Sequence, residues 1–458
     1  MTRILACCNF EDAPRSFLDS EFSVVSLDFT GLSFSDDLKV LANKKSKLLL
    51  DCTKVTSIEQ MNSWLEITPI DLKRIFWLGN EKLLLEIRKR FPEAAIWLPW
   101  NRLEMPTEDV VHSLRPEFIY LDYSLVNASN LKEVHDLGIQ VATSSMDDPF
   151  TMRWAIALGV DSISTPWVDE LHKVMMARPV MDHGRPQKME FTAIDIDHAM
   201  KVARSLGKWA IHVASTLEPG KIQHKKSAAD IVTEIDVLVE VHVREVISAN
   251  FIGHNFVGEE LGGEFQPDVP TWYLDPIDGT TNFANHLPWT SFSLALAHNR
   301  NPLVGVVIDP WRNSLLEAQA GRGAKLNGEL IRIEDQSGID SPLSSRIVST
   351  ELDAYLPWPG MIELLDGLAS QFCTMRIMGS GTLTMAGVAL KRGVGAVVGR
   401  FSAIDHLASL LIVHEAGGVV WDENGKENLF PQSGGVLTST QAAAQPLYDL
   451  WMKAIGKN

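Results

Sequence analysis

Residues 272–283 read Trp-Tyr-Leu-Asp-Pro-Ile-Asp-Gly-Thr-Thr-Asn-Phe, an apolar run that ends in two carboxylates three residues apart. Proline fixes φ and glycine permits a tight bend, so Asp275 and Asp278 are predicted to lie where a buried strand breaks into a turn. Such a turn aims both carboxylates at one point, and hard oxygen ligands of this kind suit Mg²⁺. The alternative is an acidic turn with an Asx cap.

A second motif stands downstream, where Asp405 lies ten residues before a Glu-Ala-Gly-Gly run. Together with it, the octapeptide Asp275–Asn282 resembles the metal-binding motif of the inositol monophosphatase family, and the two motifs follow the family's order. Upstream, Asp236 ends a Thr-x-x-Asp stretch and precedes the Gly-Glu-Glu segment of Glu259 by the family's usual spacing. The resemblance implies a layered α-β-α-β-α fold, of the α+β class, over residues 191–458.

The composition limits the class of protein. At 458 residues the chain is too long for one ordinary domain, and 45% hydrophobic with 22% charged residues is a globular composition. A net charge of −17 argues against nucleic acid polymers and anionic membranes as general partners. It leaves an anionic substrate open, because bound divalent cations reverse the local sign.

The four cysteines, at positions 7, 8, 52 and 373, form no CxxC pair and no zinc-binding spacing, which suits a reducing cytoplasm. Only six residues precede Cys7, too few for the apolar region of a signal peptide. No apolar run approaches the roughly 20 residues that span a membrane. We therefore expect a soluble cytoplasmic protein.

Residues 1–176 alternate short apolar runs with amphipathic stretches, which predicts a parallel sheet with crossover helices. Eight strands suffice for an α/β barrel of the (β/α)₈ type. Some of the connections are short, so both a complete and an incomplete barrel are open. The expected strands are Arg3–Cys8, Ser23–Asp28, Lys47–Cys52, Arg74–Leu78, Ala95–Leu98, Phe118–Leu121, Gln140–Thr143 and Ser162–Ser164. The expected helices include Glu81–Arg90, Ser129–Leu137 and Pro149–Leu158.

The second half of this region resembles the glycerophosphodiester phosphodiesterase family, in the stretches 130–141, 152–156 and 159–165. That family's first strand ends in His-Arg-Gly where this chain has Cys-Cys-Asn, and no room is left for its second catalytic histidine. Asp28 and Asp51 remain as barrel-mouth carboxylates without a histidine nearby in sequence. We therefore expect a non-catalytic barrel that serves packing, regulation or substrate delivery.

Residues 177–190 hold two prolines and a glycine without periodicity, which predicts a linker between two domains. Beyond it, Ile194–Leu217 has the apolar stripe of a long helix that faces the core. Further helices are expected at Leu238–Ile247, Ile362–Ser370, Leu383–Leu390 and His406–Glu415. Strands are expected at Ser291–His298, Leu303–Ile308, Leu315–Gln319, Arg376–Met378 and Gly395–Val398.

The resemblance to the phosphatase family implies a role for each residue of the site. Two or three Mg²⁺ ions would be held by Glu259, Asp275, the backbone carbonyl of Ile277, Asp278 and Asp405. The catalytic residues would be Glu259, Thr280, which orients the nucleophilic water, and Asp236, which accepts a hydrogen bond from the Thr280 hydroxyl. The resemblance further implies in-line attack by metal-bound water without a phosphoenzyme, inhibition by Li⁺, and dimerisation.

Substrate contacts are expected from the amides of Gly279 and Thr280, and from a glycine-containing loop, Gly379-Ser380-Gly381-Thr382. Free amides at the start of the helix that follows this loop could receive a phosphate or hydroxyl oxygen. Asp405 at the start of a later helix has the alternative role of a helix N-cap.

The alcohol half of the substrate is not fixed by the motifs. Inositol-cleaving members place a glutamate seven residues before the third aspartate, and Val398 stands there instead. A valine cannot accept hydrogen bonds from ring hydroxyls, so inositol phosphate is not the default substrate. Arg400 could meet a second anionic group of a bisphosphate or nucleotide, or it could be a solvated surface side chain.

The sequence thus predicts a Mg²⁺-dependent phosphomonoesterase that acts on a small sugar, polyol, inositol or nucleotide phosphate. One alternative is a bifunctional chain whose barrel cleaves a phosphodiester before the second domain removes the phosphate. Another is a phosphatase that is regulated by a ligand-sensing, non-catalytic barrel.

Overall fold

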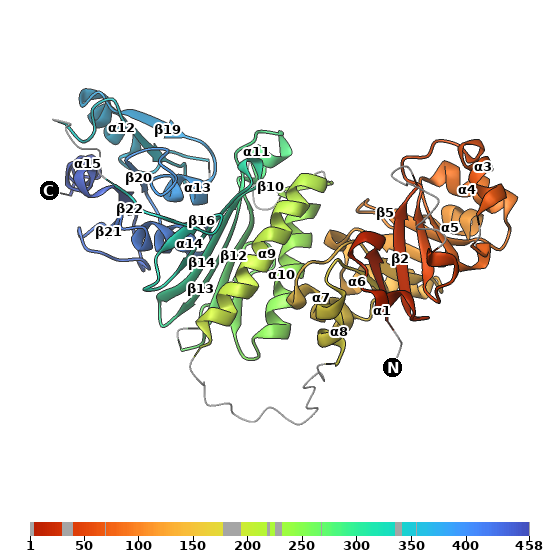
Figure 1. Cartoon of the computed structure of the whole chain (residues 1–458). Helices are drawn as coiled ribbons and strands as arrows, with labels where there is room; N and C mark the ends of the chain where they lie inside the picture. Colours follow the sequence, from red (N-terminus) through yellow and green to blue (C-terminus); the bar gives the residue numbers. More distant parts are fainter. Residues whose placement is uncertain are drawn as a thin grey trace. The chain divides into compact units, whose positions relative to one another are not determined.

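The computed structural model describes residues 4–29, 40–68, 70–176, 194–217, 220–224, 231–266, 268–334, 341–353 and 355–457 (Figure 1). The chain divides into two compact units, residues 1–185 and 186–458. The predicted linker, residues 177–190, lies outside the described residues. Within them, no helix combines the length and the apolar character that crossing a membrane requires.

The N-terminal unit is a closed barrel of eight parallel strands in sequential order, in which β1 pairs with both β2 and β8. This confirms the predicted eight-stranded parallel barrel, and it is complete. The strands are β1 Leu5–Asn9, β2 Ser23–Asp28, β3 Lys47–Asp51, β4 Ile75–Leu78, β5 Ala95–Trp100, β6 Phe118–Leu121, β7 Gln140–Thr143 and β8 Ser162–Ser164. The helices are α1 Arg15–Leu18, α3 Asn62–Ile67, α4 Glu81–Arg90, α5 Glu108–Leu114, α6 Ala128–Asp136, α7 Pro149–Leu158 and α8 Val168–Met176.

Aromatic side chains from neighbouring strands make up much of one buried cluster of the barrel. The ring of Trp97 lies 5.2 Å from that of Phe76 and 4.7 Å from that of Phe118, measured between centroids. Val24, Leu49 and other strand residues complete this cluster. Side chains of this size fill the space that an eight-stranded barrel encloses.

The C-terminal unit contains two large sheets. A seven-stranded sheet has the order β11-β12-β13-β14-β15-β16-β17, and a five-stranded sheet has the order β19-β18-β20-β22-β21. The strands of the first are β11 Asn255–Gly258, β12 Thr271–Asp278, β13 Ser291–His298, β14 Asn301–Asp309, β15 Ser314–Gln319, β16 Ala324–Leu326 and β17 Glu329–Ile331. Those of the second are β18 Ile347–Thr350, β19 Thr374–Ile377, β20 Gly395–Val398, β21 Val419–Asp422 and β22 Val436–Ser439, and β9 Ile222–His224 pairs with β10 Ile231–Thr233.

Helices form three layers around these sheets, as Figure 1 shows. Helices α9 and α10 contact the seven-stranded sheet, α13 and α14 lie between the two sheets, and α12 and α15 cover the five-stranded sheet. Their bounds are α9 Ile196–Thr216, α10 Glu234–Asn250, α11 Thr280–Ala284, α12 Met361–Ser370, α13 Gly381–Ala386, α14 Ala403–Glu415 and α15 Gln441–Ala454. The α-β-α-β-α order implied by the sequence is therefore present.

Helices α10 and α14 begin three to four residues earlier than predicted, and both corrections concern the site. Helix α10 begins at Glu234 rather than Leu238, because Thr233 and Asp236 form a reciprocal capping box. Helix α14 begins at Ala403 rather than His406, because Ser402 caps it by accepting a hydrogen bond from the Asp405 amide. Asp236 and Asp405 therefore lie in first helical turns, and Asp405 is not the N-cap itself.

Candidate active site

Strand β12 carries Asp275 and Asp278 to the end of the seven-stranded sheet. Its pairing with β13 becomes irregular between these two residues, and Gly279 follows with φ +90°, so the predicted break of a buried strand is confirmed. A Cβ atom on Gly279 would lie 2.7 Å from the Gly379 carbonyl oxygen and 3.1 Å from that of Trp289. Both the dihedral angle and this close approach require glycine.

Asp275 is the electrostatic centre of the site. It is 2% exposed, and its Oδ1 atom has no hydrogen-bond partner in the described part of the chain. Burial, followed by the charges of Glu259, Asp278 and Asp405, raises its pKa well above the ordinary value. Four acidic groups therefore lie within electrostatic reach of one another around a buried oxygen atom that lacks a partner.

Asp278 accepts hydrogen bonds from the glycine loop. The Ser380 hydroxyl donates to Oδ2 over 2.5 Å, the Thr382 amide donates to Oδ2 over 2.7 Å, and the Gly381 amide donates to Oδ1 over 3.2 Å. Burial still raises the pKa of Asp278, because desolvation outweighs these contacts. The expectation of free amides in this loop needs correction, because a carboxylate of the protein already accepts from two of them.

Asp405 reaches the same cluster from helix α14. Burial raises its pKa to about 7, with further increases from Asp278 and Glu259 and a decrease from Arg400. The Thr382 hydroxyl donates to its backbone carbonyl over 2.6 Å, which joins α14 to the glycine loop. Two segments far apart in sequence thus meet at the carboxylates of β12.

Glu259 follows strand β11, which runs parallel to β12. The turn that contains it is held by Glu240, a fully buried side chain of α10 that accepts from the Glu260 amide over 2.7 Å and the Leu261 amide over 3.1 Å. Arg244 donates to Glu240 through Nε over 2.9 Å and through a terminal nitrogen over 2.7 Å. Glu240 was not predicted as a site residue; its signal in the sequence is a glutamate among the apolar residues of a helix, four positions before an arginine.

Thr280 lies beside Asp236, as expected. Its hydroxyl is 3.3 Å from Asp236 Oδ1 and 3.1 Å from the Ile277 carbonyl oxygen. A hydroxyl has one proton, so it donates to one of these acceptors at a time and keeps lone pairs that can accept from water. Asp236 is itself fully buried and accepts from the Thr233 amide over 2.9 Å.

Two more residues that were not predicted fix the glycine loop. Glu351, just after β18, accepts from the Gly379 amide over 2.8 Å, the Met378 amide over 3.2 Å and the Thr384 hydroxyl over 2.5 Å. Asn282 donates to the carbonyl oxygens of Trp289 and Met378, each over 2.8 Å. The Asn282 side chain therefore ties the β12 motif to the loop that follows β19.

The two residues considered for substrate specificity lie in different surroundings. Val398 is 4% exposed and belongs to the hydrophobic core between the sheets. Arg400 is an exposed side chain whose guanidinium lies 3.2 Å from the Asp353 carboxylate. Arg400 is thus partnered, although it is close enough to Asp405 to lower that group's pKa.

The donor set suits a hard divalent cation, because Glu259, Asp275, Asp278 and Asp405 are oxygen ligands that repel one another at close range. The Asp275 Oδ1 atom, which has no hydrogen-bond partner among the described residues, is a buried oxygen that a cation could coordinate. Across the described ranges, no group of three or more His, Cys, Asp or Glu side chains is already close enough together to hold a metal ion. Coordination would therefore draw these carboxylates closer together.

Comparison with known proteins gives a consistent result. Residues 193–453, more than half of the chain, match the model of the inositol monophosphatase family. Inositol monophosphatase 2 of Solanum lycopersicum is 34% identical over 247 residues, which cover 51% of this chain and 88% of that protein. Fructose-1,6-bisphosphatase/inositol-1-monophosphatase of Thermotoga maritima is 33% identical over 232 residues, covering 51% of this chain and 86% of that protein.

A third relative carries a different kind of name. Nus factor SuhB of Pasteurella multocida is 36% identical over 201 residues, covering 44% of this chain and 74% of that protein. All three alignments span less than three fifths of this chain but most of the relative. The chain therefore belongs to the inositol monophosphatase family and is a phosphoric monoester hydrolase.

Proposed function

We propose that the C-terminal unit is a Mg²⁺-dependent phosphomonoesterase that hydrolyses a small phosphorylated metabolite by in-line attack of water. The main support is the convergence of Glu259, Asp278 and Asp405 around the buried Asp275 carboxylate, in a chain of a phosphatase family. Burial of several carboxylates without compensation is costly, so such a cluster is typical of a functional site rather than a stabilising one.

Glu259, Asp275, Asp278, Asp405 and the Ile277 carbonyl would hold the metal. When bound, Mg²⁺ would neutralise phosphate charge and lower the pKa of a coordinated water. Thr280, whose hydroxyl proton is directed to Asp236 or to the Ile277 carbonyl, would present a lone pair to the attacking water and so fix its direction. The amides of Gly279 and Thr280 would grip the phosphate.

The glycine loop, residues 379–382, has a modified role in this proposal. Its two amides that donate to Asp278 hold that carboxylate in place, and Glu351 fixes the loop from the other side. The loop would therefore position Asp278 first, and contact substrate through atoms that these bonds leave free.

The substrate is proposed to carry a second anionic group. Val398 is buried and offers no hydrogen bond to a sugar or polyol, whereas Arg400 is exposed near Asp405. Arg400 would exchange Asp353 for the second phosphate or carboxylate of the substrate, an exchange that exposed ion pairs allow at low cost. The Thermotoga maritima relative is named both a bisphosphatase and a monophosphatase, so its name includes this class without singling it out.

A phosphate-release screen with Mg²⁺ tests the proposal on fructose bisphosphate, inositol phosphates, sugar monophosphates, histidinol phosphate and 3′-phosphonucleotides. The Asp275→Asn variant is the control, because it keeps the side-chain shape but removes the charge. We expect release from a substrate with two anionic groups and none from the variant. Near-normal turnover by Asp275→Asn would refute the assignment of the site. Li⁺ inhibition and a homodimer are further expectations from the family.

The barrel is proposed to be non-catalytic. The support for this is that the acidic side chains at its mouth are already paired. The Asp28 carboxylate is paired with Lys54 at 2.6 Å, and Asp51 accepts from the Thr53 amide over 2.9 Å and its hydroxyl over 2.7 Å. Both acidic groups therefore have local partners. Assay of full-length Asp275→Asn on glycerophosphodiesters tests the bifunctional alternative, since alcohol release by this variant would assign the phosphodiesterase activity to the barrel.

A further inference from the structure

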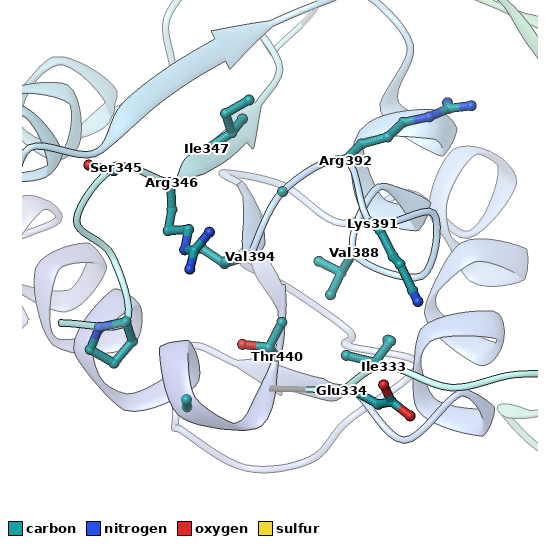
Figure 2. A pocket seen from close by; sticks show the side chains of 13 residues that line it. Ile333, Glu334, Ser345, Arg346, Ile347, Val388, Lys391, Arg392, Val394 and Thr440 are labelled. Carbon is teal, nitrogen blue, oxygen red and sulfur yellow. The ribbon is translucent and has the colours of Figure 1, made fainter. Parts of the chain in front are cut away.

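A second concave site lies in the C-terminal unit, where three chain segments meet at the ends of β18, β20 and β22 in the five-stranded sheet. The Val394 amide donates to the Ile347 carbonyl and the Thr440 amide donates to the Val394 carbonyl, each over 2.9 Å. Around these bonds is a cavity of about 610 Å³, which Figure 2 shows from close by. Its volume is within the range of small-molecule sites.

This cavity is distinct from the candidate active site. Strands β18 and β20 are parallel, and the cavity is at the ends where they begin, beside Ile347 and Val394. Glu351, which fixes the glycine loop, follows the opposite end of β18. A strand of four residues separates the two places by about 13 Å.

Two cationic side chains extend into the cavity. Figure 2 shows the Arg346 guanidinium and the Lys391 ammonium reaching toward the region of Thr440 and Ile333, whereas Arg392 turns away. In the described part of the chain neither Arg346 nor Lys391 forms an ion pair, whereas Arg392 is paired with Asp309 at 2.7 Å. Among the described residues that line the cavity, Glu334 is the one acidic residue, so this described part of the lining is net positive.

The backbone that carries Arg346 and Lys391 at the rim of the cavity has left-handed dihedral angles. Ser345, next to Arg346, has φ +59°, and Lys391 has φ +58°. Left-handed backbone is uncommon for residues other than glycine, and it persists where the surrounding structure enforces it. Both cations are thus carried on constrained rather than relaxed segments.

The lining also has an apolar part. Ile333, Pro342, Ile347, Val388 and Val394 contribute to the wall. An arginine fork and an ammonium group together favour an oxyanion with two or more charges, and an apolar wall favours a ligand with an organic body. We propose that this cavity is a second, non-catalytic binding site for a small organic phosphate.

Calorimetric titration of the full-length protein with phenylphosphonate tests this proposal. A phosphonate is suitable because its carbon–phosphorus bond is not cleaved by phosphoester hydrolysis. The titration is made in EDTA, because the candidate active site without divalent metal is a cluster of carboxylates that repels anions. We expect one binding site per chain, and weaker binding of inorganic phosphate, which lacks the apolar body.

The double variant Arg346→Gln/Lys391→Asn should bind phenylphosphonate at least tenfold more weakly, and Lys391→Asn alone is the fallback if the double variant does not fold. Asparagine is chosen at position 391 because it tolerates a positive φ. Lys208→Gln/Lys453→Gln is the matched control, since it removes two exposed positive charges elsewhere in the unit and should bind as the wild type does. Absence of binding to the wild type, or equal binding by all variants, would overturn the assignment.

Discussion

Replacing Glu240 by glutamine tests whether the turn that contains Glu259, a proposed metal ligand, depends on a residue that would not itself contact the metal. Glu240 is fully buried and accepts from the Glu260 and Leu261 amides and from Arg244. Glutamine has nearly the same shape, but it has one oxygen acceptor and a donating NH₂ group. With its oxygen in the place of Oε1 it satisfies Arg244 and the Leu261 amide but turns its NH₂ group toward the Glu260 amide, and with its oxygen in the place of Oε2 it satisfies the Glu260 amide alone.

The loss of stability in Glu240→Gln is estimated from the donor group that is left without an acceptor. A buried donor that loses its partner costs about 1–3 kcal/mol. Breaking a buried ion pair outright costs about 3–5 kcal/mol, but Arg244 is 26% exposed and can recover some hydration. We therefore expect Glu240→Gln to lower the free energy of unfolding by about 2 kcal/mol. Residues that orient metal ligands typically change metal affinity about 10–100-fold, so the Mg²⁺ concentration for half-maximal activity should rise by that factor.

A matched control separates this positioning role from a loss of stability. Glu317 is also buried and paired with an arginine, with Arg204 donating to its two oxygens over 2.5 and 2.8 Å, but it lies on β15. Urea unfolding and Mg²⁺ titration of phosphate release are measured for Glu240→Gln and Glu317→Gln. Both should lose stability, and only Glu240→Gln should need more Mg²⁺. Equal Mg²⁺ requirements in the two variants would refute the reasoning.

Four further results are expected. Gly279→Ala should lower kcat at least tenfold and destabilise the fold by about 1–3 kcal/mol. Position 279 has φ +90°, and the added Cβ would lie 2.7 Å from a carbonyl oxygen. Normal kinetics would show that the turn is adaptable. Asp275→Asn should abolish phosphate release. It should nevertheless raise the free energy of unfolding in EDTA, since it removes a buried charge whose neighbours repel it. A less stable variant would contradict the repulsion. Glu351→Gln should lower kcat/KM at least tenfold, because its NH₂ group would face an amide of the glycine loop, and unchanged kcat/KM would remove Glu351 from the site. Arg400→Ala should raise KM up to about fivefold for a bisphosphate but not for a monophosphate. Equal changes for both would exclude selection of a second anion.

The sequence predicted the parts of the fold that have strong local signals. Alternating apolar runs located all eight barrel strands, and the Asp-Pro-Ile-Asp-Gly motif located the end of β12. Helices Glu81–Arg90 and Pro149–Leu158 have the predicted bounds, and the second begins with proline after the Asp148 cap. Local periodicity and capping chemistry act within a few residues, so a single chain is enough to reveal them.

What the sequence did not reveal depends on contacts between distant segments. The partners of Asp278 lie 102–104 positions further along the chain, in the glycine loop. That loop looked available for substrate because its amides begin a helix, and no local pattern shows that a carboxylate from another sheet accepts from them. Glu240 and Glu351 were missed for the same reason, since their roles come from turns and loops that tertiary packing brings to them.

The arrangement of charge around the site explains how an acidic chain can act on anions. The residues proposed as metal ligands repel one another, and the pKa of Asp405 is raised to about 7 by burial and by this repulsion. The acids behind them are compensated, because Glu240 has Arg244 and two amides, and Glu351 has two amides and a hydroxyl. The acidic groups that repel one another are thus the ones that a divalent cation would hold, so the net charge of −17 of the whole chain does not by itself oppose substrate binding at that point. A chain built in this way should be inhibited by chelators through loss of phosphate binding as well as loss of water activation.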